Sequence, residues 1–170
     1  ALGREIIFNY AANEIDLLFV QRRANGSPLE TLVTYSGYGG TNAPHRPTSI
    51  VDAAGQTTVM EWTAEGLIRR VTDPNSHVTR YDYDSSGYLE AIFRSAPDTP
   101  IGSAGTLVEL ASFDYDSKDR VDKITLSDGY DLDFEFDHLN RLVKTTYPDG
   151  TTEETGFFAV TADKFTDRLG

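Results

Sequence analysis

Histidine is the side chain most often used for acid–base catalysis and metal binding near neutral pH, and this chain has three: His45, His77 and His138. They lie far apart in the sequence, each at or near an expected turn. None belongs to a His-x-x-x-His or His-Glu-x-x-His pattern, the spacings that place metal ligands on one helix face. We therefore expect solvated turn residues, with no catalytic histidine and no metal site.

Carboxylates are abundant, and paired acids can support glycoside hydrolysis or calcium binding. Their positions recur along the chain, however, whereas a catalytic pair is needed only once. The recurring set is Asp82, Asp84, Asp114, Asp116, Asp133, Glu135 and Asp137. Residues 82–87 approach an Asp-x-Asp-x-Asp-Gly calcium loop but have serines at the later positions. We expect these acids to bond turn backbones or to face solvent.

Other catalytic signatures are missing from the sequence. There is no Gly-x-Ser-x-Gly elbow, and residues 102–105, Gly-Ser-Ala-Gly, are one residue short of it. No glycine-rich phosphate loop occurs. The chain has no cysteine, which excludes a thiol nucleophile, a disulfide framework and a thiolate metal site. We expect no cofactor and no enzymatic activity.

The charge balance argues against two classes of partner. Lys and Arg number 15 against 27 Asp and Glu, for a net charge of −12. Such a chain repels phosphate backbones and anionic membrane surfaces, so nucleic acid is not an expected partner. No apolar run approaches the roughly 20 residues of a membrane span, and membrane insertion is not expected either.

The elements that must position these residues show an internal repeat. One unit recurs: an alternating aromatic strand, a short Asp/Ser/Gly turn, an apolar strand and a turn ending in Gly. The aromatic residues that end the first strand of each unit are Tyr10, Tyr35, Trp62, Tyr83, Tyr115, Phe136 and Phe157. Successive spacings are 25, 27, 21, 32, 21 and 21 residues. A fixed unit with loop insertions at residues 36–44 and 95–105 accounts for the longer intervals.

Each unit has the local signals of a β-hairpin. Apolar and acidic residues alternate over residues 132–137, which predicts a half-buried strand with its rings on one face and its carboxylates on the other. Gly55, Gly87, Gly129 and Gly150 supply the positive φ that tight turns require. Residues 13–20, the strongest helical competitor, are expected to form a turn and then a strand. The predicted fold is all-β, a series of tandem antiparallel hairpins that form part of a coiled sheet or shell.

These units resemble the YD repeats of RHS-type proteins. That repeat has the form aromatic-x-Tyr-Asp, two residues, Gly-Arg-Leu, and then a Pro-Asp-Gly type of turn. Tyr83-Asp84 with Gly87-Tyr88-Leu89, Tyr115-Asp116 with Asp119-Arg120-Val121, and residues 147–150 match it. Asp119 and Asn140 stand where glycine is usual, Trp62 and Phe157 are not followed by Asp, and the first two units are weak matches.

The resemblance implies that residues 1–170 form a single array of about seven repeats and are a piece of a longer repeat protein. RHS-type arrays wind into a hollow shell that, in bacterial toxin systems, encloses a C-terminal toxic domain. The expected function is therefore a segment of shell wall, in a secreted or cell-surface protein. The expected partners are the remainder of the array or other copies of the chain, and an enclosed toxin domain. Tyr10, Tyr35, Trp62, Tyr83, Gly87, Tyr115, Gly129, Phe136, Gly150 and Phe157 are expected to be structural, repeat-defining residues.

The alternative function is an adhesion or carbohydrate-binding module, in which aromatic rings stack on sugars. The two functions differ in one expected feature. Glycan binding needs exposed Tyr or Trp side chains in a cluster, whereas a wall needs the recurring rings to be buried in a continuous row. The sequence does not identify a binding residue for either.

Overall fold

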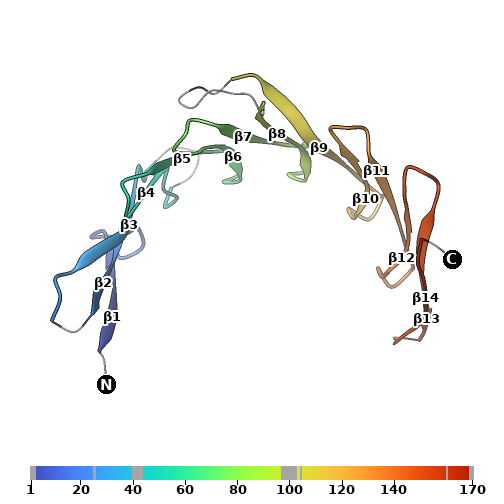
Figure 1. The fold of residues 1–170 in the computed structure, drawn as a ribbon, viewed down its shortest axis with the longest axis horizontal. Helices are drawn as coiled ribbons and strands as arrows, with labels where there is room; N and C mark the ends of the chain where they lie inside the picture. The colour runs from blue at the N-terminus through green and yellow to red at the C-terminus, as the bar shows by residue number, and fades with distance from the viewer. Residues whose placement is uncertain are drawn as a thin grey trace. The chain divides into compact units, whose positions relative to one another are not determined.

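In the computed structural model the chain is an all-β protein, and the predicted fold class is confirmed. The structure describes residues 3–24, 26–39, 44–96, 103, 105–159 and 161–168. Fourteen strands follow one another in chain order in one antiparallel sheet, so each strand pairs with its sequence neighbours (Figure 1). The described residues include no helix, and hence none long and apolar enough to cross a membrane.

The chain divides into two compact units, each a run of hairpins. Unit 1 comprises Ala1–Tyr81 and Arg94–Leu107, and unit 2 comprises Asp82–Phe93 and Val108–Gly170. The first seven strands are β1 (Arg4–Tyr10), β2 (Leu17–Ala24), β3 (Glu30–Ser36), β4 (Ser49–Asp52), β5 (Thr57–Trp62), β6 (Ile68–Thr72) and β7 (Val78–Tyr83). The other seven are β8 (Leu89–Ser95), β9 (Leu107–Tyr115), β10 (Val121–Leu126), β11 (Asp131–Phe136), β12 (Leu142–Thr146), β13 (Thr152–Phe158) and β14 (Thr161–Thr166).

The predicted hairpin boundaries agree with the observed strands. Five of the seven recurring aromatics are the last residue of a strand, and Tyr35 and Phe157 are the last but one. Several of them pair across a β-bulge, an extra residue on the following strand that increases the local twist. Trp62 pairs with Ile68, and Phe136 pairs with Leu142, each at a register shift. Residues 13–16 form a turn before β2, as expected.

The two faces of the sheet in unit 2 differ in chemistry. Along β11, Leu132, Phe134 and Phe136 are half-buried, whereas Asp133 and Glu135 between them are exposed. Cross-strand partners share a face, so the pairing extends each set to the neighbouring strands. The ring face carries Phe113, Tyr115, Ile124, Leu132, Phe134, Phe136 and Phe157. The polar face carries Asp114, Lys123, Asp131, Asp133, Glu135, Lys144 and Glu154.

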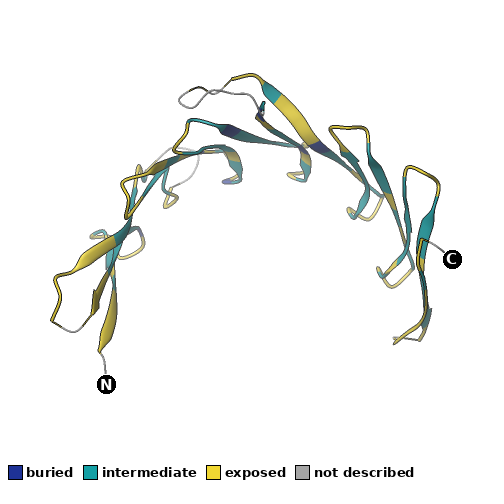
Figure 2. Cartoon of the chain, in the orientation of Figure 1, coloured by how far each residue is buried: buried dark blue, intermediate teal, exposed yellow. Residues whose placement is uncertain are grey.

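The core is thin, and this corrects one expectation. Tyr10 is 52% exposed, and the other six recurring aromatics are half-buried rather than buried. Among the described residues only four apolar side chains are buried: Met60, Val78, Ala91 and Ala111. Contacts run between strands adjacent in sequence, so the rings are covered by their neighbours and not by a second layer. Most strand residues are accordingly half-buried, and exposure is concentrated in the turns and in the outer strands β1 and β14 (Figure 2).

The most buried side chain lies in unit 1, where a serine replaces a backbone partner. Val78, the first residue of β7, is 1% exposed. Its backbone N–H donates to Ser95 Oγ at 2.8 Å, and Ser95 is itself only 7% exposed. A buried N–H needs an acceptor, so this hydroxyl satisfies a group that water does not reach.

Candidate functional site

The aspartate that follows three of the aromatic anchors forms the hairpin turn. In three successive turns, Oδ1 of Asp84, Asp116 or Asp137 accepts hydrogen bonds from the backbone N–H groups two and four residues later, at 2.8–3.1 Å. Asp52 and Asp73 bond their own turns in the same way. Asp84, Asp116 and Asp137 therefore have the turn-bonding role expected from their recurrence, and Asp52 and Asp73 show the same role outside the recurring set.

The fourth residue of these turns adopts positive φ. Its backbone N–H donates to the carbonyl of the first residue, as Gly87 does to Asp84 at 3.1 Å. Gly87 has φ 89°, and Asp119 and Asn140 hold φ 62° and 63° at the equivalent position. Asn and Asp tolerate this left-handed conformation better than other side chains with a Cβ atom. The two departures from glycine therefore keep the turn geometry.

The second kind of turn closes the other side of a unit. Gly129 and Gly150 have φ 80° and 78°, and their N–H groups donate to Leu126 O and Tyr147 O. The aspartate before each glycine, Asp128 or Asp149, accepts a hydrogen bond from the backbone N–H two residues later, at 3.0 Å. The glycines that the sequence singles out thus lie where a Cβ atom would be strained.

One side chain links each of the Asp84, Asp116 and Asp137 turns to the next repeat, and the sequence patterns assigned it no role. It is the fifth residue after the anchor: Tyr88, Arg120 or Arg141, here called the clasp residues. The Arg120 guanidinium lies 4.5 Å from the centroid of the Phe136 ring, and that of Arg141 lies 4.1 Å from the Phe157 ring. Tyr88 packs on Tyr115 at 5.2 Å between centroids. Each clasp residue therefore contacts the anchor of the following repeat.

The clasp arginines also hold their own turns. Arg120 Nε donates to Asp116 Oδ2 at 2.7 Å, and Arg141 Nε donates to Asp137 Oδ2 at the same distance. The hydrogen bond from Arg120 is the main reason that the pKa of Asp116 falls to about 2. Partial desolvation raises the pKa of Asp137, but hydrogen bonds from the Arg141 and Leu139 backbone and from the Arg141 guanidinium outweigh it and lower the pKa to about 2.

The lowered pKa values of Asp116 and Asp137 predict that the β9–β10 and β11–β12 turns are sensitive to acid. A carboxylate whose pKa is depressed by folding stabilises the fold fully above its unfolded value near 3.8, and this contribution is lost as the pH falls toward 2. We expect amide protection at Arg120 and Arg141 to decrease between about pH 4 and 2, as followed by hydrogen exchange corrected for intrinsic rates. Asp116→Asn should remove this pH dependence at Arg120 and leave it at Arg141.

The histidines do not gather into a site. His45 is exposed, but its Nδ1 lies 2.9 Å from Oδ1 of Asp16, which is only 8% exposed, so it is not simply solvated. His77 Nδ1 lies 3.5 Å from Oδ2 of Asp73 in its own turn, and His138 is exposed. Within the described ranges, no group of three or more His, Asp or Glu residues could hold a metal ion. Residues 97–102 and 104 of the second insertion lie outside the described residues.

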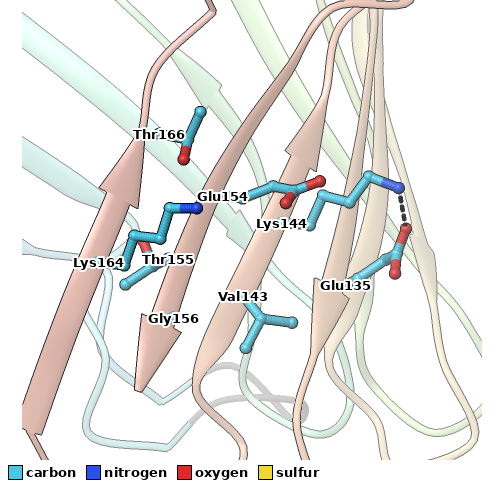
Figure 3. Close-up of a pocket in the computed structure, with 8 residues that line it drawn as sticks. All are labelled: Glu135, Val143, Lys144, Glu154, Thr155, Gly156, Lys164 and Thr166. Atoms are coloured by element: carbon cyan, nitrogen blue, oxygen red, sulfur yellow. Dashed lines mark hydrogen bonds and ion pairs between the residues drawn. The ribbon is translucent and has the colours of Figure 1, made fainter. Parts of the chain in front are cut away.

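A shallow hollow of about 470 Å³ lies on the polar face of unit 2. The hollow is lined by Glu135 of β11, Lys144 of β12, Glu154 of β13 and Lys164 of β14 (Figure 3). Lys144 Nζ forms an ion pair with Glu135 Oε1 at 2.8 Å. Gly156 also lines the hollow, and a Cβ at this position would come within 3.1 Å of Asp163 Oδ1. Charges of both signs alternate here, so the hollow has no preference for a ligand of one charge.

Comparisons with known proteins give a family and a fold. The model of the RHS Repeat family matches residues 62–92 and 113–152, and no curated protein matches in sequence. The crystal structure of TcdB2-TccC3 has a TM-score of 0.57 at 12% identity, covering 96% of this chain and 11% of that one. A Tc holotoxin pore of Photorhabdus luminescens has a TM-score of 0.58 at 14% identity, and the match covers 97% of this chain and 10% of that one. The chain thus spans about a tenth of the structures whose fold it shares.

Proposed function

We propose that this chain, which belongs to the RHS-repeat family, is a segment of the wall of a β-sheet shell in a longer repeat protein. The observation that carries the proposal is the repeated hairpin itself: turns held by aspartate, anchored by aromatics and joined by clasp residues, with each strand paired to its sequence neighbours. Such an arrangement extends a sheet and presents no catalytic constellation in its described part.

The finer proposal is that the shell encloses or presents a C-terminal effector domain in a secreted toxin. Support comes from the fold shared with TcdB2-TccC3 and with the Tc holotoxin pore. The partners are then the flanking repeats and the enclosed domain. The wall role is non-enzymatic and needs no cofactor.

A carbohydrate-binding or adhesion module is supported less well. All nine tyrosines and Trp62 lie in the described part of the chain, and only Tyr10 among them is exposed. Trp62 is half-buried, and its Nε1–H donates to Pro47 O at 3.0 Å. Stacking on sugars by tyrosine or tryptophan needs several of these rings exposed side by side, and here Trp62 and eight of the nine tyrosines are half-buried.

Protease protection of the effector in the full-length protein tests the enclosure. An intact wall should protect the effector from added protease, and Val78→Asp should abolish that protection, because it places a charge at a position that is 1% exposed. Val59→Asp is the matched control on β5, since Val59 is 43% exposed, and should leave the effector protected. An effector cleaved at equal rates in the wild-type protein and in Val78→Asp would contradict enclosure.

A further inference from the structure

The clasp residues reach beyond the anchor ring to one particular residue of the next turn. Arg120 Nη1 donates to Asn140 Oδ1 at 2.9 Å, and Arg141 Nη1 donates to the carbonyl oxygen of Ala159. The charge of Asp119, with partial desolvation and a hydrogen bond to that carboxylate, raises the pKa of Tyr88. Each clasp residue therefore has a polar partner one repeat further on.

All three partners adopt positive φ, where glycine would be unstrained. Asp119, Asn140 and Ala159 have φ 62°, 63° and 51°. Asp119 and Asn140 occupy the place that glycine takes at Gly55, Gly66 and Gly87. Holding a residue other than glycine at positive φ costs free energy. At Asp119 and Asn140 the hydrogen bond accepted from the clasp residue offsets that cost.

The sequence shows the complementary case. The fifth residue after Trp62 is Leu67, which has no side-chain donor, and the turn after the following anchor, Tyr83, has Gly87. A hydrogen-bonding clasp residue thus goes with a left-handed residue other than glycine in the following turn, and the apolar Leu67 goes with Gly87.

We infer that Tyr88 with Asp119, and Arg120 with Asn140, form matched pairs that help to fix the register in which one hairpin docks on the next. Tandem hairpins with similar strands are prone to slip, because a two-residue shift keeps the ring face and the polar face unchanged. The tight turn that joins two strands favours one register. A polar pair that forms in that register only adds to this preference, as a single buried asparagine does in coiled coils. These matched pairs lie within the sheet, so the inference does not depend on what the wall encloses.

A double-mutant cycle measures the coupling at Arg120 and Asn140. The four proteins are the wild-type chain, Arg120→Lys, Asn140→Gly and the double variant, and the readout is hydrogen exchange of the Asp137 and Arg141 amides, which close this turn. Glycine at position 140 relieves the backbone strain but removes the acceptor of the Arg120 hydrogen bond. Where Arg120 is already lysine, only the relief of strain remains. Asn140→Gly should therefore slow exchange of the two amides more in the Arg120→Lys background than in the wild-type chain. We expect a coupling of about 3- to 10-fold in the opening equilibrium, the size of one hydrogen bond.

Ser76→Gly is the matched control. Ser76 holds φ 70° at the same turn position, in the Asp73 turn that follows no anchor of the repeat. The substitution should increase protection of the His77 amide equally in the wild-type chain and in the Arg120→Lys variant. A coupling within about twofold of unity at Arg120 and Asn140 would overturn the matched pair.

Cysteine trapping measures the register directly, because the chain has no cysteine of its own. Lys123 and Asp133 are cross-strand partners on β10 and β11, the two strands that the Arg120 clasp joins. A disulfide in Lys123→Cys/Asp133→Cys reports the native register, and one in Lys123→Cys/Glu135→Cys reports a two-residue slip. Adding Arg120→Lys and Asn140→Gly should raise the yield of the slipped disulfide severalfold. An unchanged yield would overturn the role in register, even if the cycle shows coupling.

Discussion

Replacing Ser95 by alanine is expected to lower the free energy of unfolding of unit 1 by about 1–3 kcal/mol. The Val78 N–H loses its 2.8 Å acceptor in a place where Val78 is 1% and Ser95 7% exposed. Water does not reach the site to replace the hydroxyl, so the full desolvation penalty of the amide appears in the folded state. The result is measured by urea unfolding followed through Trp62, the only tryptophan of the chain.

Ser86→Ala is the control for this substitution. Ser86 is exposed in the Asp84 turn, and it contacts Asp84 through its backbone N–H, which alanine retains. The change should therefore stay within about 0.5 kcal/mol. Equal unfolding midpoints for Ser95→Ala and the wild-type chain would show that the Val78 amide finds another acceptor.

Sequence patterns predict the hairpins well because the turn chemistry is local. An aspartate that bonds N–H groups two and four residues away, and a glycine at positive φ, are both visible within five consecutive residues. The alternation of apolar and acidic residues along β11 likewise predicts the ring face and the polar face, because successive side chains of a strand point to opposite faces.

The clasp residues are harder to predict because their contacts are not local. Arg120 meets Phe136 and Asn140, 16 and 20 residues later, and Tyr88 meets Tyr115 across the second insertion. The signal was present in the Gly-Arg-Leu place of three units, where Tyr88, Arg120 and Arg141 recur. The contact of His45 with Asp16 escapes sequence patterns likewise, since the two residues lie 29 positions apart.

The degree of ring burial also depends on more than the pattern. Alternation indicates which face carries the rings, but burial depends on whether a second layer covers that face. The contacts within each unit run between neighbouring strands, and the anchors after Tyr10 are covered by the side chains beside them. Half-buried aromatics are the physical result of a sheet built from hairpins alone.

The outer strand β1 should make the isolated chain associate as its concentration rises. Among the described residues only β2 pairs with β1, whose side chains Ile6, Phe8 and Tyr10 are 52%, 56% and 52% exposed. An unpaired strand edge with exposed apolar side chains is a template for another strand. At about 0.15 M salt the Debye length is near 8 Å, so the charge of −12 does not prevent contact between two copies. Light scattering over a range of concentrations should show a rising average mass.

Phe8→Lys should reduce this association, because a lysine on an edge strand disfavours pairing with a second chain. Ile15→Lys is the matched control: Ile15 is 61% exposed, but it lies in the turn after β1 and not on the strand edge, so its substitution should leave the mass curve unchanged. A wild-type chain that stays monomeric at every concentration would mean that its outer strands need no partner. The segment would then have to be regarded as a closed binding domain rather than as part of a wall.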